Sequence, residues 1–422
     1  MKINNTLSFS PKIVYLTIFV YPLWTLFLSI KYFRFSQAKN LFWLFCVFLG
    51  MIHIYFPEGE SDYDGSRYAE RLIELHQKPI SLENYMASYY EDGEFTDIYQ
   101  PTVTYLLSTI TANPRWLFLI FAFVFGFFYS RNIWFLLDKL PKIIGFSLLL
   151  LTCYYALICP IWEINGVRMW TALHVFMYGA LPFLYNADKS KLVWCFASLL
   201  IHFSFFIPLL ILLTYHFMPK SIHVFLSIYI LSLFVTEINF ESVRVFLMNH
   251  TPSFLDSKLN YTNEEYAQNV IEAKSNMNFY IEGSKLLSKW VITVLLITAS
   301  ILIIRTVNVH RNLFKLLCFS LFIYSLSNIL SLIPSGGRFI ILSQMFAFAS
   351  VTMFYIHYKQ SEYKPKSISL VFKYTPIALL MPILVMLRTG CDYYGISIFF
   401  NPVMALYVND HQPVIQLIKS IF

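Results

Sequence analysis

The sequence has few charged residues and no motif of a nucleotide-binding enzyme. Asp, Glu, Lys and Arg make up 13% of the 422 residues, whereas 57% are hydrophobic and 19% are aromatic. Soluble globular domains carry about 25% charged residues, so this composition excludes a soluble domain of useful size. There is no Walker A motif, dinucleotide fingerprint or GxSxG elbow, which disfavours an ATP-driven or soluble-nucleotide enzyme. The six cysteines form no CxxC and no Cys/His metal spacing, so we expect no disulfide framework, no metal and no cofactor.

Apolar stretches long enough to cross a bilayer recur along nearly the whole chain. A hydrocarbon core of about 30 Å requires about 20 apolar residues in a helix. We therefore predict an all-α, polytopic integral membrane protein, with one membrane domain over residues 1–422 and about 10 to 12 transmembrane helices. We expect the first apolar run to be retained, and the net charge of +7 to reflect topology signals. Full spans are predicted at residues 13–30, 40–56, 115–137, 142–160, 169–186, 221–240, 286–304, 313–333, 338–357 and 370–388.

Two apolar segments do not fit a simple crossing. Residues 101–112 are too short, and residues 192–217 are interrupted by polar residues and a proline. The basic connections share one side, as the positive-inside rule requires, only if 192–217 returns to the side where it started. We therefore predict that 192–217 is a broken helical pair, that 101–112 is a re-entrant or interfacial helix, and that both termini face outward. Two large loops, 57–114 and 241–285, then lie on the outer face.

The stretch "CPIWEINGVRMW" places polar residues at the edge of a predicted span. Asn165 and Arg168 are three positions apart, so they share one face of a helix that begins here. A helix N-terminus favours an anion, which an arginine can clamp with two hydrogen bonds. Alternatively, Arg168 extends to lipid headgroups as an ordinary anchor. In either case we expect Glu163 to be the partner that neutralises and orients Arg168.

Two other arginines lie at predicted outer turns. Arg338 follows Gly336 and Gly337, whose amides can form a concavity for an anion before an apolar helix. The alternative is a tight interhelical turn with Arg338 as an interfacial anchor. Arg388 ends another predicted span and is a substrate-binding candidate.

The interrupted segment "LLIHFSFFIPLL" is predicted to line a cavity. Pro208 has no N–H to donate to the carbonyl of Ser204, so a helix here is kinked and leaves an acceptor free beside His202. His202 could act as a general base or bind a sugar, or it could join two helices by a hydrogen bond.

The first outer loop contains the acidic run "ESDYDGSRYAERLIELH". Asp62 and Asp64 have the spacing of a DxD metal motif, but a solvated Asx-turn is the more common role. Tyr68 lies four positions after Asp64, so both would share a helix face. Carboxylates and tyrosines together suit carbohydrate, whereas tyrosines at a membrane surface also form ordinary interfacial belts.

The order of these features resembles the EpsG-like branch of the Wzy-type polymerases, which act on bacterial O-antigen, capsule and exopolysaccharide repeat units. The resemblance covers roughly residues 13 to 217, and the later part agrees mainly in layout. The residues that carry it are Asp64-Gly-Ser-Arg-Tyr68, Asn165-Gly-Val167-Arg168, His202-Phe-Ser204 and a late outer arginine, Arg338.

The resemblance implies glycosyl transfer at the outer (periplasmic) face of the bacterial inner (cytoplasmic) membrane. A growing glycan would move from undecaprenyl pyrophosphate to a lipid-linked repeat unit, with a chain-length regulator as a further partner and no role for nucleic acid. Negative charge develops on the departing pyrophosphate, and arginine can stabilise it without metal. The implied catalytic residues are Arg168, Arg338 and a base, His202 or Asp64; the substrate-binding candidates are Asn165, Tyr68, Arg67, Ser204 and Arg388.

Three alternatives stay open from the sequence. A glycosyltransferase that uses a polyprenyl-phosphate sugar and an O-antigen ligase would both place similar residues on the outer face. A lipid-linked oligosaccharide flippase would instead show polar residues deep in several spans.

Overall fold

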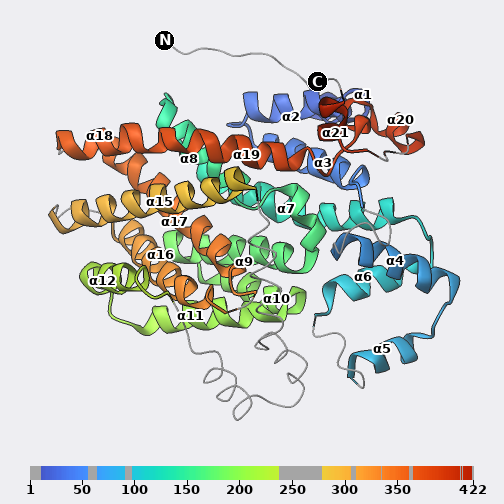
Figure 1. Ribbon diagram of the computed structural model, residues 1–422, viewed down its shortest axis with the longest axis horizontal. Helices are drawn as coiled ribbons and strands as arrows, with labels where there is room; N and C mark the ends of the chain where they lie inside the picture. The colour runs from blue at the N-terminus through green and yellow to red at the C-terminus, as the bar shows by residue number, and fades with distance from the viewer. Residues whose placement is uncertain are drawn as a thin grey trace.

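The computed structural model describes residues 11–55, 64–90, 97–236, 278–305, 310–333, 335–360, 365–408, 410 and 412–420. Within these residues every regular element is a helix (Figure 1), which confirms the all-α class. Six helical segments of this described part are long and apolar enough to cross a membrane, in agreement with a polytopic membrane protein. They are Pro114–Leu137, Phe146–Asn186, Phe279–Arg305, Arg311–Leu330, Arg338–Gln360 and Lys366–Gly390.

The helices follow one another in three runs. The first run is α1 (Pro11–Val20), α2 (Pro22–Lys31), α3 (Ala38–Met51), α4 (Asp64–Gln77), α5 (Leu82–Tyr90), α6 (Tyr99–Ser108) and α7 (Pro114–Leu137). The second is α8 (Phe146–Leu157), the 3-10 helix η1 (Ile161–Gly166), α9 (Val167–Asn186), η2 (Lys189–Lys191), α10 (Leu192–Ile201), η3 (Phe203–Phe205), α11 (Phe206–Phe217) and α12 (Ile222–Ser232). The third is α15 (Phe279–Arg305), α16 (Arg311–Leu330), α17 (Arg338–Gln360), α18 (Lys366–Tyr374), η5 (Thr375–Leu379), α19 (Leu380–Gly390), η6 (Ile396–Phe399), α20 (Pro402–Tyr407) and α21 (Val414–Lys419).

Helix α7 lies in the core and packs closely against α3 and also against α9. Gly50 and Gly126 permit the close approach to α3, because a Cβ on Gly50 would collide with Ala122 and one on Gly126 would press on Cys46. Small residues at helix interfaces are how apolar helices gain dispersion contacts in a membrane. Some of the apolar side chains that composition alone would place against lipid therefore pack between helices.

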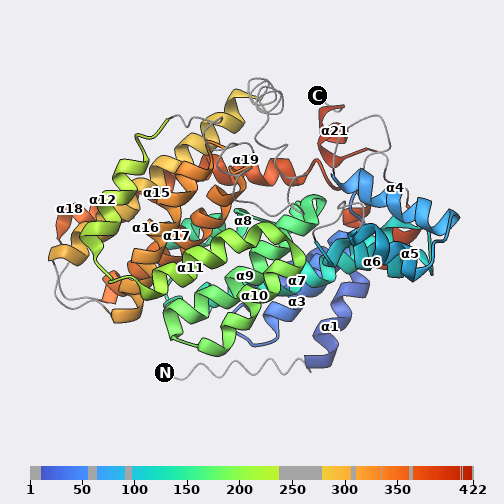
Figure 2. The ribbon, with the colours of Figure 1, turned by 90° about the horizontal axis from the view of Figure 1, so that it is seen from below.

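Helices α4, α5 and α6 lie together at one side of the molecule, opposite α12, α16 and α18 (Figures 1 and 2). Helix α4 is amphipathic and packs on α6 and α7 through its apolar face, which includes Tyr68, Leu72 and Leu75. Helix α6 corresponds to the predicted short helix at 101–112; its 10 residues are too few to cross a bilayer. The part of the second predicted loop up to residue 277 lies outside the described residues, and α15 begins within its last part.

The segment 192–217 is interrupted as predicted, although at a different residue. Helix α10 ends at Ile201, His202 is extended with φ −150° and ψ 116°, and α11 begins at Phe206. Pro208 is the third residue of α11. An N–H in the first turn of a helix has no intrahelical partner, so a proline in this position removes no hydrogen bond of α11. The extended residue of the interruption is therefore His202, six positions before Pro208.

Both ends of this segment lie at the same end of the helix bundle. The ring of His216, near the end of α11, lies 5.5 Å from the ring of Phe183, near the end of α9, which η2 and α10 follow. Tyr215 Oη also donates a 2.7 Å hydrogen bond to the carbonyl of Lys315 at the start of α16. This is the arrangement that a broken pair returning to its starting side requires.

The predicted span at 13–30 is not one helix. Tyr21 is extended, with φ −157° and ψ 103°, and α2 begins at Pro22. A proline disfavours the helical conformation of the preceding residue and lacks the N–H that would continue the helix. The predicted single crossing is therefore corrected to two helices of 10 residues each.

Several other predicted spans are shorter or joined. Helix α3 ends at Met51 and α12 at Ser232, whereas 366–390 contains α18, η5 and α19. The predicted spans 142–160 and 169–186 correspond to α8 and α9, which are connected by residues 158–160, where Pro160 is extended, and by η1. Since six described segments meet the criteria of length and apolarity, the number of about 10 to 12 crossings stays a prediction.

Candidate functional site

Polar residues from four distant parts of the chain line one pocket of about 190 Å³. The parts are the start of α4, η1 with the first turn of α9, the break at His202, and the start of α17. The lining residues are Asp64, Tyr68, Glu163, Asn165, Gly166, Arg168, Met169, Trp170, His202 and Arg338. All four residues that the resemblance implies to be catalytic, and two of the substrate-binding candidates, are thus brought together.

Asn165 attaches α4 to the start of α9. Its Oδ1 accepts a hydrogen bond from the backbone N–H of Gly65 at 3.0 Å. A Cβ on Gly65 would collide with that same oxygen, so the contact requires glycine. Since a helix N-terminus has four N–H groups without intrahelical partners, this bond satisfies one of them and places Asp64 and Tyr68 beside Arg168.

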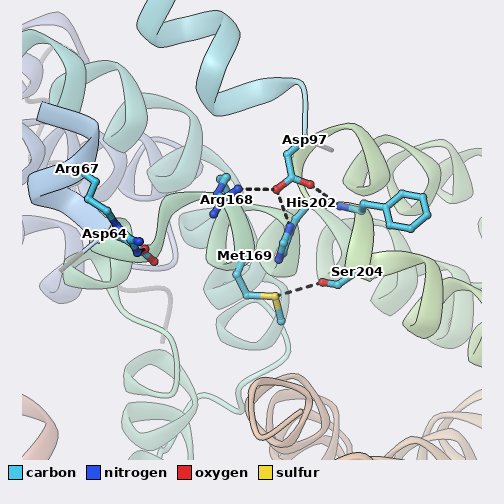
Figure 3. A network of polar contacts seen from close by, with 8 residues as sticks. Asp64, Arg67, Asp97, Arg168, Met169, His202 and Ser204 are labelled. Carbon is cyan, nitrogen blue, oxygen red and sulfur yellow. Dashed lines mark hydrogen bonds and ion pairs between the residues drawn. The ribbon is translucent and has the colours of Figure 1, made fainter. Parts of the chain in front are cut away.

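Asp97 is the site residue that sequence reasoning missed. One of its oxygens, Oδ2, accepts hydrogen bonds from an Arg168 guanidinium nitrogen at 3.2 Å and from His202 Nδ1 at 2.8 Å (Figure 3). The other, Oδ1, accepts from the backbone N–H of Phe203 at 2.8 Å. Its side chain is 1% exposed, against 32% for Arg168 and 17% for His202. The only sequence signal is an acidic residue just before a short apolar helix, which marks a helix start and nothing more.

The surroundings of Asp97 keep it ionised. Burial raises the pKa of its carboxyl. The hydrogen bond from His202, the charge of that ring when it is protonated, the Phe203 amide and the charge of Arg168 together lower the pKa by more, so it lies below its ordinary value. An ionised carboxylate only accepts hydrogen bonds, so His202 Nδ1 carries a proton. In the neutral imidazole Nε2 is then the acceptor.

Tyr68 is the buried hydroxyl of the pocket. Burial raises its pKa, and the charge of Asp64 adds to this effect while Arg168 opposes it. Tyr68 therefore stays a neutral phenol near pH 7, able to donate a hydrogen bond.

Arg338 differs from Arg168 in having no carboxylate partner among the described residues. Its side chain makes no ion pair with any residue in the described part of the chain. It follows a tight turn in which Ser335 has φ +65°, and a Cβ on Gly336 would collide with the carbonyl of Leu330. The Gly336 amide donates to the Ile333 carbonyl at 2.9 Å within this turn. That amide is consequently not available for the predicted anion-binding concavity, and Arg338 itself is the group that faces the pocket.

Three predicted substrate-binding residues do not line the pocket. Arg67 pairs with Asp64 on the exposed side of α4. The Ser204 hydroxyl donates to Met169 Sδ at 3.7 Å (Figure 3). Arg388 pairs with Asp392 at 2.8 Å, one turn further along the chain. Each has a partner within the protein.

The expected pairing of Glu163 with Arg168 is wrong, because Asp97 takes that place. Glu163 lines the pocket and makes no ion pair with any described residue. Among the described residues there is no group of three or more His, Cys, Asp and Glu side chains that could hold a metal ion. Asp62 of the DxD motif lies outside the described residues.

The pocket combines groups suited to an anion with groups suited to a proton transfer. Two guanidinium groups can bind phosphate oxygens, and His202 can accept a proton through Nε2. Comparisons with family models, with curated proteins and with solved structures find no match to this chain.

Proposed function

We propose that this protein is a membrane glycosyltransferase that polymerises lipid-linked repeat units of a bacterial polysaccharide. It would transfer a growing glycan from undecaprenyl pyrophosphate to a lipid-linked repeat unit at the outer face of the inner membrane. The observation that carries the proposal is that Arg168 and Arg338, from helices α9 and α17, line one pocket with His202.

The proposed reaction forms one glycosidic bond and breaks one bond to phosphate. A hydroxyl oxygen of the acceptor sugar attacks the anomeric carbon of the donor glycan, and the bond from that carbon to the pyrophosphate oxygen breaks. The hydroxyl proton passes to His202 Nε2, and the bond electrons leave with the pyrophosphate. Arg168 and Arg338 stabilise the charge that develops there, while Tyr68 and Asn165 position the sugars.

The two arginines have complementary roles in this scheme. Arg168 is already held by Asp97, so its position is fixed before substrate binds. Arg338 has no carboxylate partner among the described residues, so its full charge is available to the pyrophosphate. Asp64, paired with Arg67, is less suited to be the base than His202.

Arginine variants test the proposal in a bacterium whose own repeat-unit polymerase has been deleted. Arg168→Ala and Arg338→Ala should each abolish long glycan chains and leave single repeat units on the acceptor lipid, at normal protein levels. Loss of one such cation typically costs about 10²- to 10³-fold in rate. Arg71→Ala is the matched control, because Arg71 pairs with Glu74 at 2.9 Å and does not line the pocket.

The glycan pattern separates the proposal from its alternatives. Wild-type ladders from both pocket variants would rule out the mechanism. In a host that keeps its polymerase but lacks its ligase, long chains that leave undecaprenyl pyrophosphate with the wild-type protein and remain on it with the variants would indicate a ligase. A reporter fusion at Lys220 checks the topology; the proposed broken pair requires a cytoplasmic signal there.

A further inference from the structure

Asp97 joins the cation and the base of the pocket. Its Oδ2 accepts from Arg168 at 3.2 Å and from His202 Nδ1 at 2.8 Å. We propose that Asp97 is a positioning residue, which fixes the tautomer of His202 and the place of Arg168 for the transfer. This inference rests on the proposed function for its role in the reaction, but its effect on His202 can be measured without any reaction.

The burial of Asp97 separates its role from that of the lining residues. Its side chain is 1% exposed and does not line the pocket. It therefore acts through the two groups that it holds and not by touching a substrate. A buried carboxylate with all its partners in place is a well-defined support for catalytic groups.

Asp97 and its neighbour also replace backbone hydrogen bonds that the helix break removes. In a continuous helix the N–H of Phe203 and the carbonyl of Leu200 would both have intrahelical partners. Here Phe203 N–H donates to Asp97 Oδ1 at 2.8 Å, and Leu200 accepts from Ile98 N–H at 3.0 Å. The segment before α6 thus keeps residue 202 extended, which directs its ring toward the carboxylate.

The carboxylate leaves only one arrangement of protons on a neutral His202. Since Oδ2 can only accept, Nδ1 must donate and Nε2 is free to take a proton. An amide at position 97 can present its NH₂ group to Nδ1 instead, which favours the opposite tautomer with the proton on Nε2. That tautomer has no free nitrogen facing away from residue 97, so it cannot accept the acceptor's proton there.

Nitrogen NMR of the full-length chain tests this inference directly. The protein is labelled with 15N-histidine, placed in lipid nanodiscs, and the His202 signals are identified by their absence from His202→Gln. We expect an Nδ1–H tautomer in the wild type and an Nε2–H tautomer in Asp97→Asn. The amount of long-chain glycan should fall by about 10²-fold or more in Asp97→Asn, the lower end of the range for a lost proton transfer.

Phe203→Pro is the matched control for local structure. It removes the backbone N–H that donates to Asp97 but leaves the carboxylate and His202 in place, so the Nδ1–H tautomer should persist. The same tautomer in wild type and Asp97→Asn would overturn the inference. If Asp97→Asn changes the tautomer of His202 but the wild-type protein makes no polymer, the effect of Asp97 on His202 is supported and the proposed reaction is overturned.

Discussion

Two breaks within apolar helical segments of the described chain, at Tyr21 and at His202, differ in what holds them. At Tyr21 the break precedes Pro22, and the hydroxyls of Thr17 and Thr25, which belong to the same segment, share a 3.0 Å hydrogen bond across it. At His202 the residue that follows is Phe203, and the break is held by Asp97 from a segment 105 positions away. Both break residues are extended.

This difference separates a local cause from a tertiary one. A proline breaks a helix wherever it is placed in the interior, so the break at Tyr21 follows from the sequence alone. The break at His202 leaves backbone groups that need partners, and a second segment supplies them. Only the second break lines the pocket.

Asp97→Ala should have the largest effect. It removes the acceptor for three donors, at Arg168, His202 and Phe203. Bonds to a charged group contribute about 1.5–3 kcal/mol each and are not additive, so we expect a loss of about 3 kcal/mol in unfolding free energy. Denaturation in mixed micelles measures this, and a loss below about 0.5 kcal/mol, the usual range of surface substitutions, would contradict it.

Acid should destabilise the protein by protonating the carboxylate of Asp97. Because the folded pKa of Asp97 is lowered, its contribution to stability is fully present above the unfolded pKa, near 3.8, and is lost as pH falls through the folded value. The melting temperature of the wild type should therefore drop more steeply below about pH 4 than that of Asp97→Asn. Parallel curves would show that the carboxylate contributes no pH-dependent stability.

Phe203→Pro makes the second break resemble the first. His202 already has the extended conformation that precedes a proline, and residue 203 is the first of η3. The backbone therefore fits, and the loss should be about 2 kcal/mol, for one bond to a charged acceptor. Phe203→Ala controls for the missing ring, and equal melting temperatures of the two variants would show that this bond contributes nothing.

Pro22→Ala should lower the free energy of unfolding by less than Phe203→Pro does. Removing the proline adds freedom to the unfolded chain, which costs about 0.4–1 kcal/mol. Glycan ladders should stay at the wild-type level, because this break contributes no lining residue to the pocket. Loss of the ladder with normal protein levels would show that α1 and α2 support the site.

Pro208→Ala should have the smallest effect, within about 0.5 kcal/mol. Pro208 lies in the first turn of α11, where its missing N–H is not needed. Paired spin labels at the ends of α10 and α11 should give wild-type distances. A continuous helix in this variant would show that the proline causes the break after all.

Much of the site can be predicted from local sequence signals, but the contacts between residues far apart in the sequence cannot. Asn165 and Arg168 are neighbours on one turn, and a short spacing is enough to predict their shared face. Glu163 looked like the partner of Arg168 because it is near in sequence. The actual partner is 71 positions away, and no local pattern carries that information. Similarly, Pro208 suggested a kink at Ser204, whereas the extended residue is His202, whose ring Asp97 contacts.

The sequence by itself determined that this protein is helical and built for a membrane. Long apolar runs must satisfy their backbone groups internally, and helices do so without help from distant residues. It also determined the break at Tyr21, since proline acts on its immediate neighbours. Only the tertiary structure decided which carboxylate meets Arg168 and His202. A buried side chain pairs with whatever the packing of other segments brings within about 3 Å, and that depends on the whole fold.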